Sequence, residues 1–102
     1  MNDKFIGLKA FVFITATNIG RRVFLQYKED IRNGKKITSS YRSQTSAWMY
    51  ERLMEDSAVC DAYQQARREE GFPEFWESIA CSILEWAYEA PSKYYMMLTA
   101  KD

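Results

Sequence analysis

Hydrophobic and polar positions alternate with a period of two over the first part of the chain. Ile6, Leu8, Val12 and Ile14 share one parity, and from residue 10 onward the positions between them are also largely apolar. Alternation of this kind is typical of a β-strand, and apolar residues on both parities indicate a strand that is covered on both faces. The pattern therefore predicts a central strand near the start of the chain.

Two turn signals follow, at residues 17–20 and at Asn33–Gly34. Asn and Gly adopt positive φ at little cost, and an Asn-Gly pair favours the type I′ turn of a β-hairpin. Alternation resumes over residues 22–28 and again from Lys36 to Tyr41. Residues 5–42 are therefore predicted to form a three-stranded antiparallel meander.

The period becomes helical after Ser43. Thr45 or Ser46 is suited to cap a first helix, because a hydroxyl oxygen accepts the free amides of the first turn. Asp56–Ser57 offers a second cap, where that helix is expected to break.

Gly71 and Pro73 mark the end of one helix and the start of the next, since Gly is favoured after a helix and Pro in its first turn. Apolar residues from Trp76 to Tyr88 recur at the spacing i, i+3, i+4, i+7, which predicts a helix over about residues 73–89 that Pro91 ends. The tail at residues 93–99 is ambiguous, and we assign it to a short fourth strand.

These elements predict a single α+β domain over residues 1–102, with an antiparallel sheet of three or four strands packed against two or three helices. Apolar residues make up 47% and aromatic residues 16% of the chain, which excludes a disordered protein. No apolar run approaches the roughly 18 residues of a membrane span, and the start lacks the cleavage site of a signal peptide. We therefore expect a cytoplasmic protein without membrane contact.

The net charge of zero hides two halves of opposite sign. Residues 1–43 carry nine bases and three acids, a net charge of +6, and residues 44–102 carry five bases and eleven acids, a net charge of −6. Such asymmetry indicates a charged partner, because complementary potentials steer association. The alternatives are that the two halves face each other or that copies of the chain pack head to tail.

Residues that support catalysis near neutral pH are scarce. Histidine is absent, and with it the commonest general base and metal ligand. Cys60 and Cys81 lack metal or disulfide spacing and are expected to be buried, reduced thiols. Paired glutamates on the helices are expected to form a solvated face, with a carboxylate active site or a divalent ion as the alternative. The sequence therefore predicts a non-enzymatic protein without metal or cofactor.

The predicted sheet supplies the candidate binding surface. Its helix-covered face is expected to bear Ile6, Leu8, Val12, Ile14, Val23, Leu25, Ile37 and Tyr41. Basic residues and phenylalanines on the opposite face suit nucleic acid, where cations meet phosphates and rings meet bases. The same face suits an acidic protein or a second copy of the chain, unless other parts of the chain cover it. The binding residues predicted in this way are Phe11, Phe13, Arg22, Phe24, Lys28, Lys36 and Arg42.

Residues 21–50 resemble two groups of phage proteins. They combine Asn33-Gly34-Lys35, a strand that ends at Tyr41, and a helix that opens with residues 47–50. This stretch is similar to the sheet-plus-helix module of phage integrases, which lies on DNA, and to small phage anti-CRISPR proteins, which bind and block a CRISPR effector. The second resemblance implies an inhibitor that binds a host protein or nucleoprotein complex. The integrase resemblance implies a nucleic-acid-binding module, which we keep as the alternative.

Overall fold

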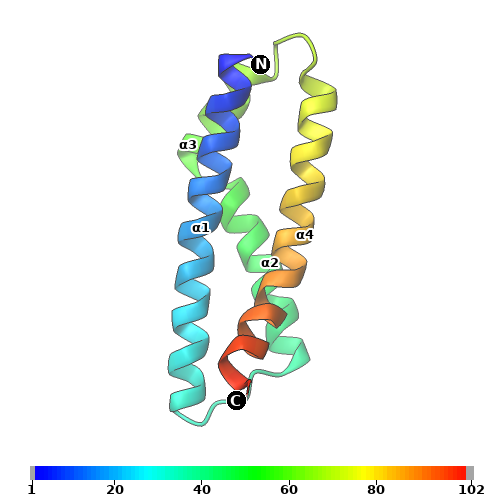
Figure 1. Cartoon of the computed structure of the whole chain (residues 1–102). Coiled ribbons are helices and arrows are strands. Elements are labelled where there is room, and N and C mark those ends of the chain that lie inside the picture. Colours follow the sequence, from blue (N-terminus) through cyan, green and yellow to red (C-terminus); the bar gives the residue numbers. More distant parts are fainter. Residues whose placement is uncertain (1, 101–102) are drawn as a thin grey trace.

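The computed structural model describes residues 2–100, and in that range it consists of α-helices and their connections, without a strand. The helices are α1 (Asp3–Arg32), α2 (Ser39–Met54), α3 (Ser57–Ala66) and α4 (Phe72–Thr99). In Figure 1, α1 runs down the molecule, α2 and α3 return in succession, and α4 runs down again. The result is a rod with extents of 50 × 24 × 21 Å, in effect a three-helix bundle whose middle helix is broken.

The predicted α+β fold with its antiparallel sheet is therefore wrong, and the protein is all-α. The error lies in residues 5–42, where a second period runs beneath the alternation. The buried residues of α1 recur three, four or seven apart, the spacing of one helix face. They are Phe5, Leu8, Val12, Ile19, Val23, Tyr27 and Asp30, with the small residue Gly20 beside them.

Asn33–Gly34 ends a helix and does not form the predicted hairpin turn. Asn33 is the C-cap of α1, and Gly34 adopts a φ of 79°. The Gly34 amide donates to the Ile31 carbonyl at 3.0 Å and the Lys35 amide donates to the Asp30 carbonyl at 2.8 Å. This pair of bonds is the Schellman motif, in which a left-handed glycine satisfies the last carbonyls of a helix.

The start of α2 lies earlier than predicted, and its end lies where the sequence placed it. Thr38, rather than Thr45 or Ser46, is the N-cap, and its hydroxyl accepts the Tyr41 amide at 3.1 Å. The predicted break at Asp56 is confirmed, because the Asp56 carboxylate accepts the Val59 amide at 3.0 Å and caps α3.

The prediction for α4 is confirmed at its start and wrong at its end. Gly71, with a φ of 83°, precedes the helix, and Pro73 lies in its first turn. Pro91 does not end the helix, which continues to Thr99, so residues 93–99 are not a strand. Proline bends a helix because it lacks an amide hydrogen and crowds the preceding turn. The last part of α4 accordingly leans across toward α1 (Figure 1).

The core lies between the helices along the length of the rod, and not on one face of a sheet. Of the residues predicted to face the helices, Leu8, Val12, Val23 and Ile37 are buried, and Tyr41 is half-buried. The remaining three, Ile6, Ile14 and Leu25, are exposed, as is Leu84 of the predicted stripe in α4. Residues at i and i+2 lie about 200° apart around a helix, so a shared parity does not give a shared face.

Candidate functional site

The two ends of the rod carry opposite charge. Residues 18–50 and 86–100 form the lower part in Figure 1, with the α1–α2 connection and the C-terminal end of α4. They carry eight bases and three acids, a net charge of +5, and we call this part the basic end. The other described residues, 2–17 and 51–85, carry five bases and ten acids, a net charge of −5, and form the acidic end. The asymmetry of the sequence is thus an axial separation of charge.

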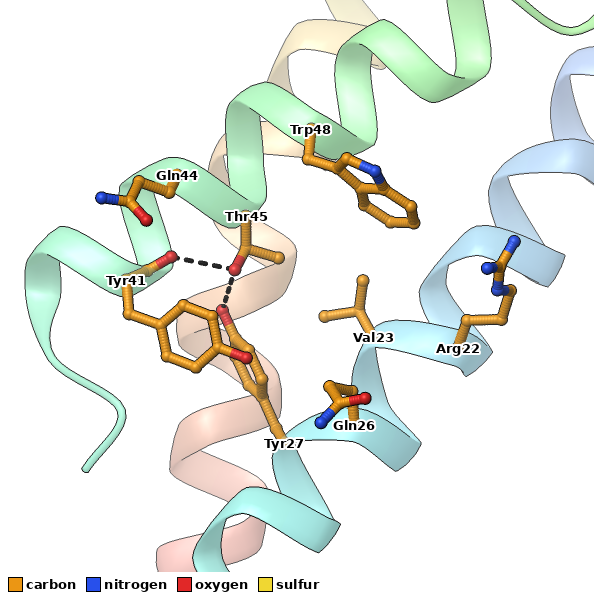
Figure 2. Close-up of a pocket in the computed structure, with 8 residues that line it drawn as sticks. All are labelled: Arg22, Val23, Gln26, Tyr27, Tyr41, Gln44, Thr45 and Trp48. Atoms are coloured by element: carbon orange, nitrogen blue, oxygen red, sulfur yellow. Dashed lines mark hydrogen bonds between the residues drawn. The ribbon is translucent and has the colours of Figure 1, made fainter. Parts of the chain in front are cut away.

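A groove of about 370 Å³ runs between α1 and α2 at the basic end (Figure 2). We call it the α1–α2 groove. On each helix the lining residues are spaced three or four positions apart, so one face of α1 meets one face of α2. The lining residues are Arg22, Val23, Gln26, Tyr27, Tyr41, Gln44, Thr45 and Trp48.

A chain of hydrogen bonds joins the two helices beneath this groove. The Tyr27 hydroxyl donates to the Thr45 hydroxyl at 2.7 Å, and the Thr45 hydroxyl donates to the Tyr41 carbonyl at 2.9 Å (Figure 2). The Tyr41 hydroxyl donates to one oxygen of Asp30 at 2.6 Å, and the Gln26 amide donates to the other at 2.8 Å. Buried polar groups that are all paired hold their neighbours in one arrangement.

Asp30 is the buried charge of this network, with 6% of its surface exposed. Within residues 2–100 it forms no ion pair, and two side-chain donors stabilise its carboxylate. Burial and the hydrogen bond to Asp30 raise the pKa of Tyr41 above its ordinary value of 10.0. Burial also raises the pKa of Tyr27. Both phenols therefore stay protonated at neutral pH and remain hydrogen-bond donors.

The open mouth of the groove carries a cation beside an indole. Figure 2 shows Arg22 of α1 and Trp48 of α2 at the same end of the groove, with Val23 of α1 below the Trp48 ring. The Arg22 guanidinium carbon lies 5.8 Å from the centre of the Trp48 ring, and Trp48 is 40% exposed. This distance is within the range of a cation–π interaction, and Arg22 has no carboxylate partner in the described part of the chain.

Two further bases of the basic end lie on aromatic rings. The Lys35 ammonium is 4.4 Å from the Tyr41 ring, and the Arg42 guanidinium carbon is 4.7 Å from the Tyr95 ring. Arg42 also donates to the Ile37 carbonyl at 2.6 Å. These contacts fix the positions of the bases without neutralising them, so the positive charge remains available to a ligand.

The predicted binding residues do not form one surface. Phe11 and Phe13 lie in the acidic end on different sides of α1, because Phe11 lines a groove toward α3 and Phe13 one toward α4. Phe24 is half-buried, with its ring 5.7 Å from Tyr94 in an edge-to-face contact. The four predicted bases all lie in the basic end: Arg22, Lys28, Lys36 and Arg42.

Sequence reasoning missed the α2 side of the groove, Gln44, Thr45 and Trp48, as well as Gln26 of α1. The signal was present, since Tyr41, Thr45 and Trp48 follow one another at helical spacing, as do Arg22 and Gln26. It becomes visible only when residues 21–48 are read as two helices.

The structure places both cysteines at the surface. Cys60 and Cys81 are exposed, so the expectation of buried thiols is wrong. Each lies away from the core face of its helix, where a small apolar residue is not needed. Among residues 2–100, no three Cys, Asp or Glu side chains gather in a way that could hold a metal ion.

Comparison with protein-family models, with curated proteins and with solved structures finds no match to this chain. Within the described residues, each helix is too short or too polar to cross a membrane.

Proposed function

We propose that this chain is a non-enzymatic binding protein that docks on an acidic surface of a partner protein and blocks it. The α1–α2 groove and the bases around it would form the docking site. The observation that carries this proposal is the concentration of charge, a net +5 in one end of a chain that is neutral as a whole. The absence of histidine leaves few groups for acid–base chemistry near neutral pH, which favours binding as the activity.

Arg22 and Trp48 have the properties of an interface anchor. Trp, Tyr and Arg are enriched among the residues that contribute most to protein–protein binding. An arginine fork pairs with a carboxylate through two parallel hydrogen bonds, and the indole offers a large rigid surface beside it. Because the network below the groove holds α1 and α2 together, little rotamer and backbone freedom would be lost on binding.

The distribution of charge favours a protein over a nucleic acid. A nucleic acid is a continuous polyanion, and one that lay along the 50 Å rod would pass from the basic end to the acidic end. Charges interact over only about 8 Å at physiological ionic strength, so the acidic end would repel the strand locally. A limited acidic patch on a protein matches the basic end alone. A host protein or nucleoprotein effector with such a patch is the partner class that we propose.

Poly-L-glutamate and polythymidylate serve as probes for this proposal. Arg22→Glu/Lys28→Glu removes two exposed bases from the basic end. Lys9→Glu/Arg68→Glu is the matched control, because it changes the net charge equally but in the acidic end. Fluorescence titration should show poly-L-glutamate binding that falls at least about tenfold, or about 1.4 kcal/mol, in the first variant and little in the control. Trp48→Ala should weaken binding without altering net charge.

Two results would overturn the proposal. Equal losses in both charge variants would mean that the probe responds to net charge and not to the basic end. Binding of polythymidylate alone, with a log–log salt slope of about −0.7 for each phosphate contacted, would identify a nucleic-acid ligand instead.

A further inference from the structure

The middle of the rod is a belt without charge. Residues 10–20 of α1, 43–50 of α2 and 78–84 of α4 contain no Asp, Glu, Lys or Arg, and neither do residues 86–88. In the part of the chain that the structure describes, eleven large apolar side chains are exposed, and seven of them belong to this belt. The seven are Phe11, Phe13, Ile14, Trp48, Tyr50, Leu84 and Tyr88.

One group of these side chains is continuous across α2 and α4. Tyr50 and Leu84 line the same groove of about 280 Å³, whose walls include Val59, Trp76 and Ile83. The Ser46 hydroxyl donates to the Tyr88 carbonyl at 3.5 Å, so Tyr88 lies on α4 beside the turn of α2 that precedes Tyr50. Leu84 is 56% and Tyr88 is 80% exposed. We call Tyr50, Leu84 and Tyr88 the α2–α4 patch.

Exposed apolar patches with a polar border mark interaction sites, and the charge pattern identifies the partner. Toward the acidic end of the rod the patch is followed by Glu77 of α4, and toward the basic end by Arg42 and by Lys93, which also pairs with Glu89 of its own helix at 3.4 Å. A two-fold axis through the patch, perpendicular to the rod, would place apolar residues on apolar residues and each acidic end on a basic end. A parallel pair would instead place like charges together.

We propose that two copies of this chain associate side by side and antiparallel through the α2–α4 patch. Such a contact is isologous, so it closes as a dimer and does not extend into a filament. About a two-fold axis between Leu84 and Tyr88, Leu84 of one copy meets Tyr88 of the partner subunit. Along the direction of α4, the same axis brings Glu77 to within about one helical turn of the level of Lys93 of the partner subunit.

The size of the face is sufficient for this contact. The rod as a whole has extents of 50 × 24 × 21 Å. One long side of it is therefore larger than the area of about 800 Å² that each partner buries in a standard interface. The α1–α2 groove lies on the other side of α2, so the dimer would leave the proposed docking site open. The inference does not require the proposed function, and the two tests change different residues: the poly-L-glutamate test changes Arg22, Lys28 and Trp48, which lie outside the α2–α4 patch.

Sedimentation equilibrium tests the patch. The wild-type chain should form dimers, and Leu84→Ser/Tyr88→Ser should raise the dimer dissociation constant at least about tenfold. Phe13→Ser/Ile14→Ser is the matched control, because it removes exposed apolar residues from the same belt on the α1 side. A monomeric wild type, or an equal effect of both variants, would overturn the proposal. Circular dichroism should show that both variants remain helical.

A charge exchange tests the antiparallel arrangement. Glu77→Lys alone and Lys93→Glu alone each place like charges opposite one another twice in a dimer, so both should dimerise more weakly than wild type. In an equimolar mixture the two variants should form a heterodimer, because every contact again joins opposite charges. The advantage of the heterodimer over the two homodimers should diminish at high salt. Failure of the mixture to recover would exclude the antiparallel register, even if the patch itself were required.

Discussion

The two ends of the rod share one apolar core and differ in the contacts added to it. In the acidic end, aromatic rings from three helices pack on one another. Phe5 of α1 stacks on Phe75 of α4 with ring centres 4.5 Å apart, and Tyr63 of α3 meets Trp76 of α4 edge-to-face at 4.9 Å. In the basic end, where Val23 and Met49 are also buried, the hydrogen-bonded network around Asp30 adds a polar link between α1 and α2.

This difference separates stability from recognition. Apolar burial is roughly proportional to area and has little directional preference, so the aromatic end can contribute much of the free energy of folding. Hydrogen bonds are directional, so the polar network keeps Arg22 and Trp48 in register across two helices at a smaller net gain. The proposed docking site lies in the basic end, where the directional hydrogen bonds are. Four predictions test this division, in order of decreasing effect.

The largest effect is expected from Phe72→Ala in the acidic end. Phe72 is buried and its ring contacts those of Phe5, Tyr63 and Trp76. Removing a buried phenylalanine should lower the free energy of unfolding by about 3–5 kcal/mol, measured by urea denaturation. Phe13→Ala is the control, since Phe13 is 71% exposed and should cost less than about 0.5 kcal/mol. Similar costs for the two would contradict a core in this end.

Asp30→Asn should have a smaller effect, confined to the basic end. The substitution keeps the size of the side chain but removes the charge that accepts from Tyr41 and Gln26. Hydrogen bonds to charged groups contribute about 1.5–3 kcal/mol, and we expect a loss in that range. Amide NMR shifts should change in residues 22–48 and not around Phe72. The exposed neighbour Glu29, changed to Gln, is the control. A loss as large as that of Phe72→Ala would contradict the division.

The effect of Gly20→Ala on the free energy of unfolding should change sign when the Tyr94 hydroxyl is removed. A Cβ at Gly20 would collide with the Tyr94 hydroxyl, and Tyr94 is braced by Phe24. We expect Gly20→Ala alone to destabilise by about 1–3 kcal/mol, as overpacking does. In a Tyr94→Phe background the collision disappears, and the same change should stabilise by up to about 1 kcal/mol through helix propensity. Thermal melting of the four proteins measures both values. Destabilisation in both backgrounds would exclude the hydroxyl as the cause.

The same contrast between local and distant interactions explains what the sequence could predict. Asp56 and Gly71 were assigned correctly, because a cap depends on a few neighbouring residues. Residues 11–15 combine aromatic and β-branched side chains, and Phe11 and Phe13 occupy exposed positions. Apolar residues outside the core face thus conceal the helical spacing from Leu8 to Tyr27. The prediction that Pro91 ends the helix is wrong because the packing that keeps the helix intact around it is tertiary.

The candidate site was predictable only in its charge. The bases Arg22, Lys28, Lys36 and Arg42 stand out in any secondary structure, because charge does not depend on period. Trp48 and Tyr41 become part of the groove only when α2 packs against α1. That pairing depends on contacts such as Tyr27 with Thr45, eighteen residues apart, for which a single sequence carries no signal.

The smallest effects should appear at the extremes of pH, and at opposite ends of the rod. Burial raises the pKa of Tyr27, Tyr41 and Tyr94 above the ordinary value of 10.0, and all three lie in the basic end. A raised pKa contributes stability that is present below about pH 10 and is lost as the pH rises toward the folded-state value. Raising the pH above about 10 should therefore destabilise the basic end before the acidic end.

Glu69 in the acidic end behaves in the opposite way. Hydrogen bonds from Lys4, at 2.6 Å, and from Asn2 lower its pKa below the ordinary value of 4.5. Its contribution is present above about pH 4.5 and is lost as the pH falls through the lower folded-state value. Because the pair is exposed to solvent, we expect a weak effect. Amide hydrogen exchange should quicken near Lys4 and Glu69 in acid for the wild type, with less dependence on pH in Lys4→Met. If amide exchange in acid instead quickened first around Asp30, the prediction that acid acts on the acidic end would be wrong.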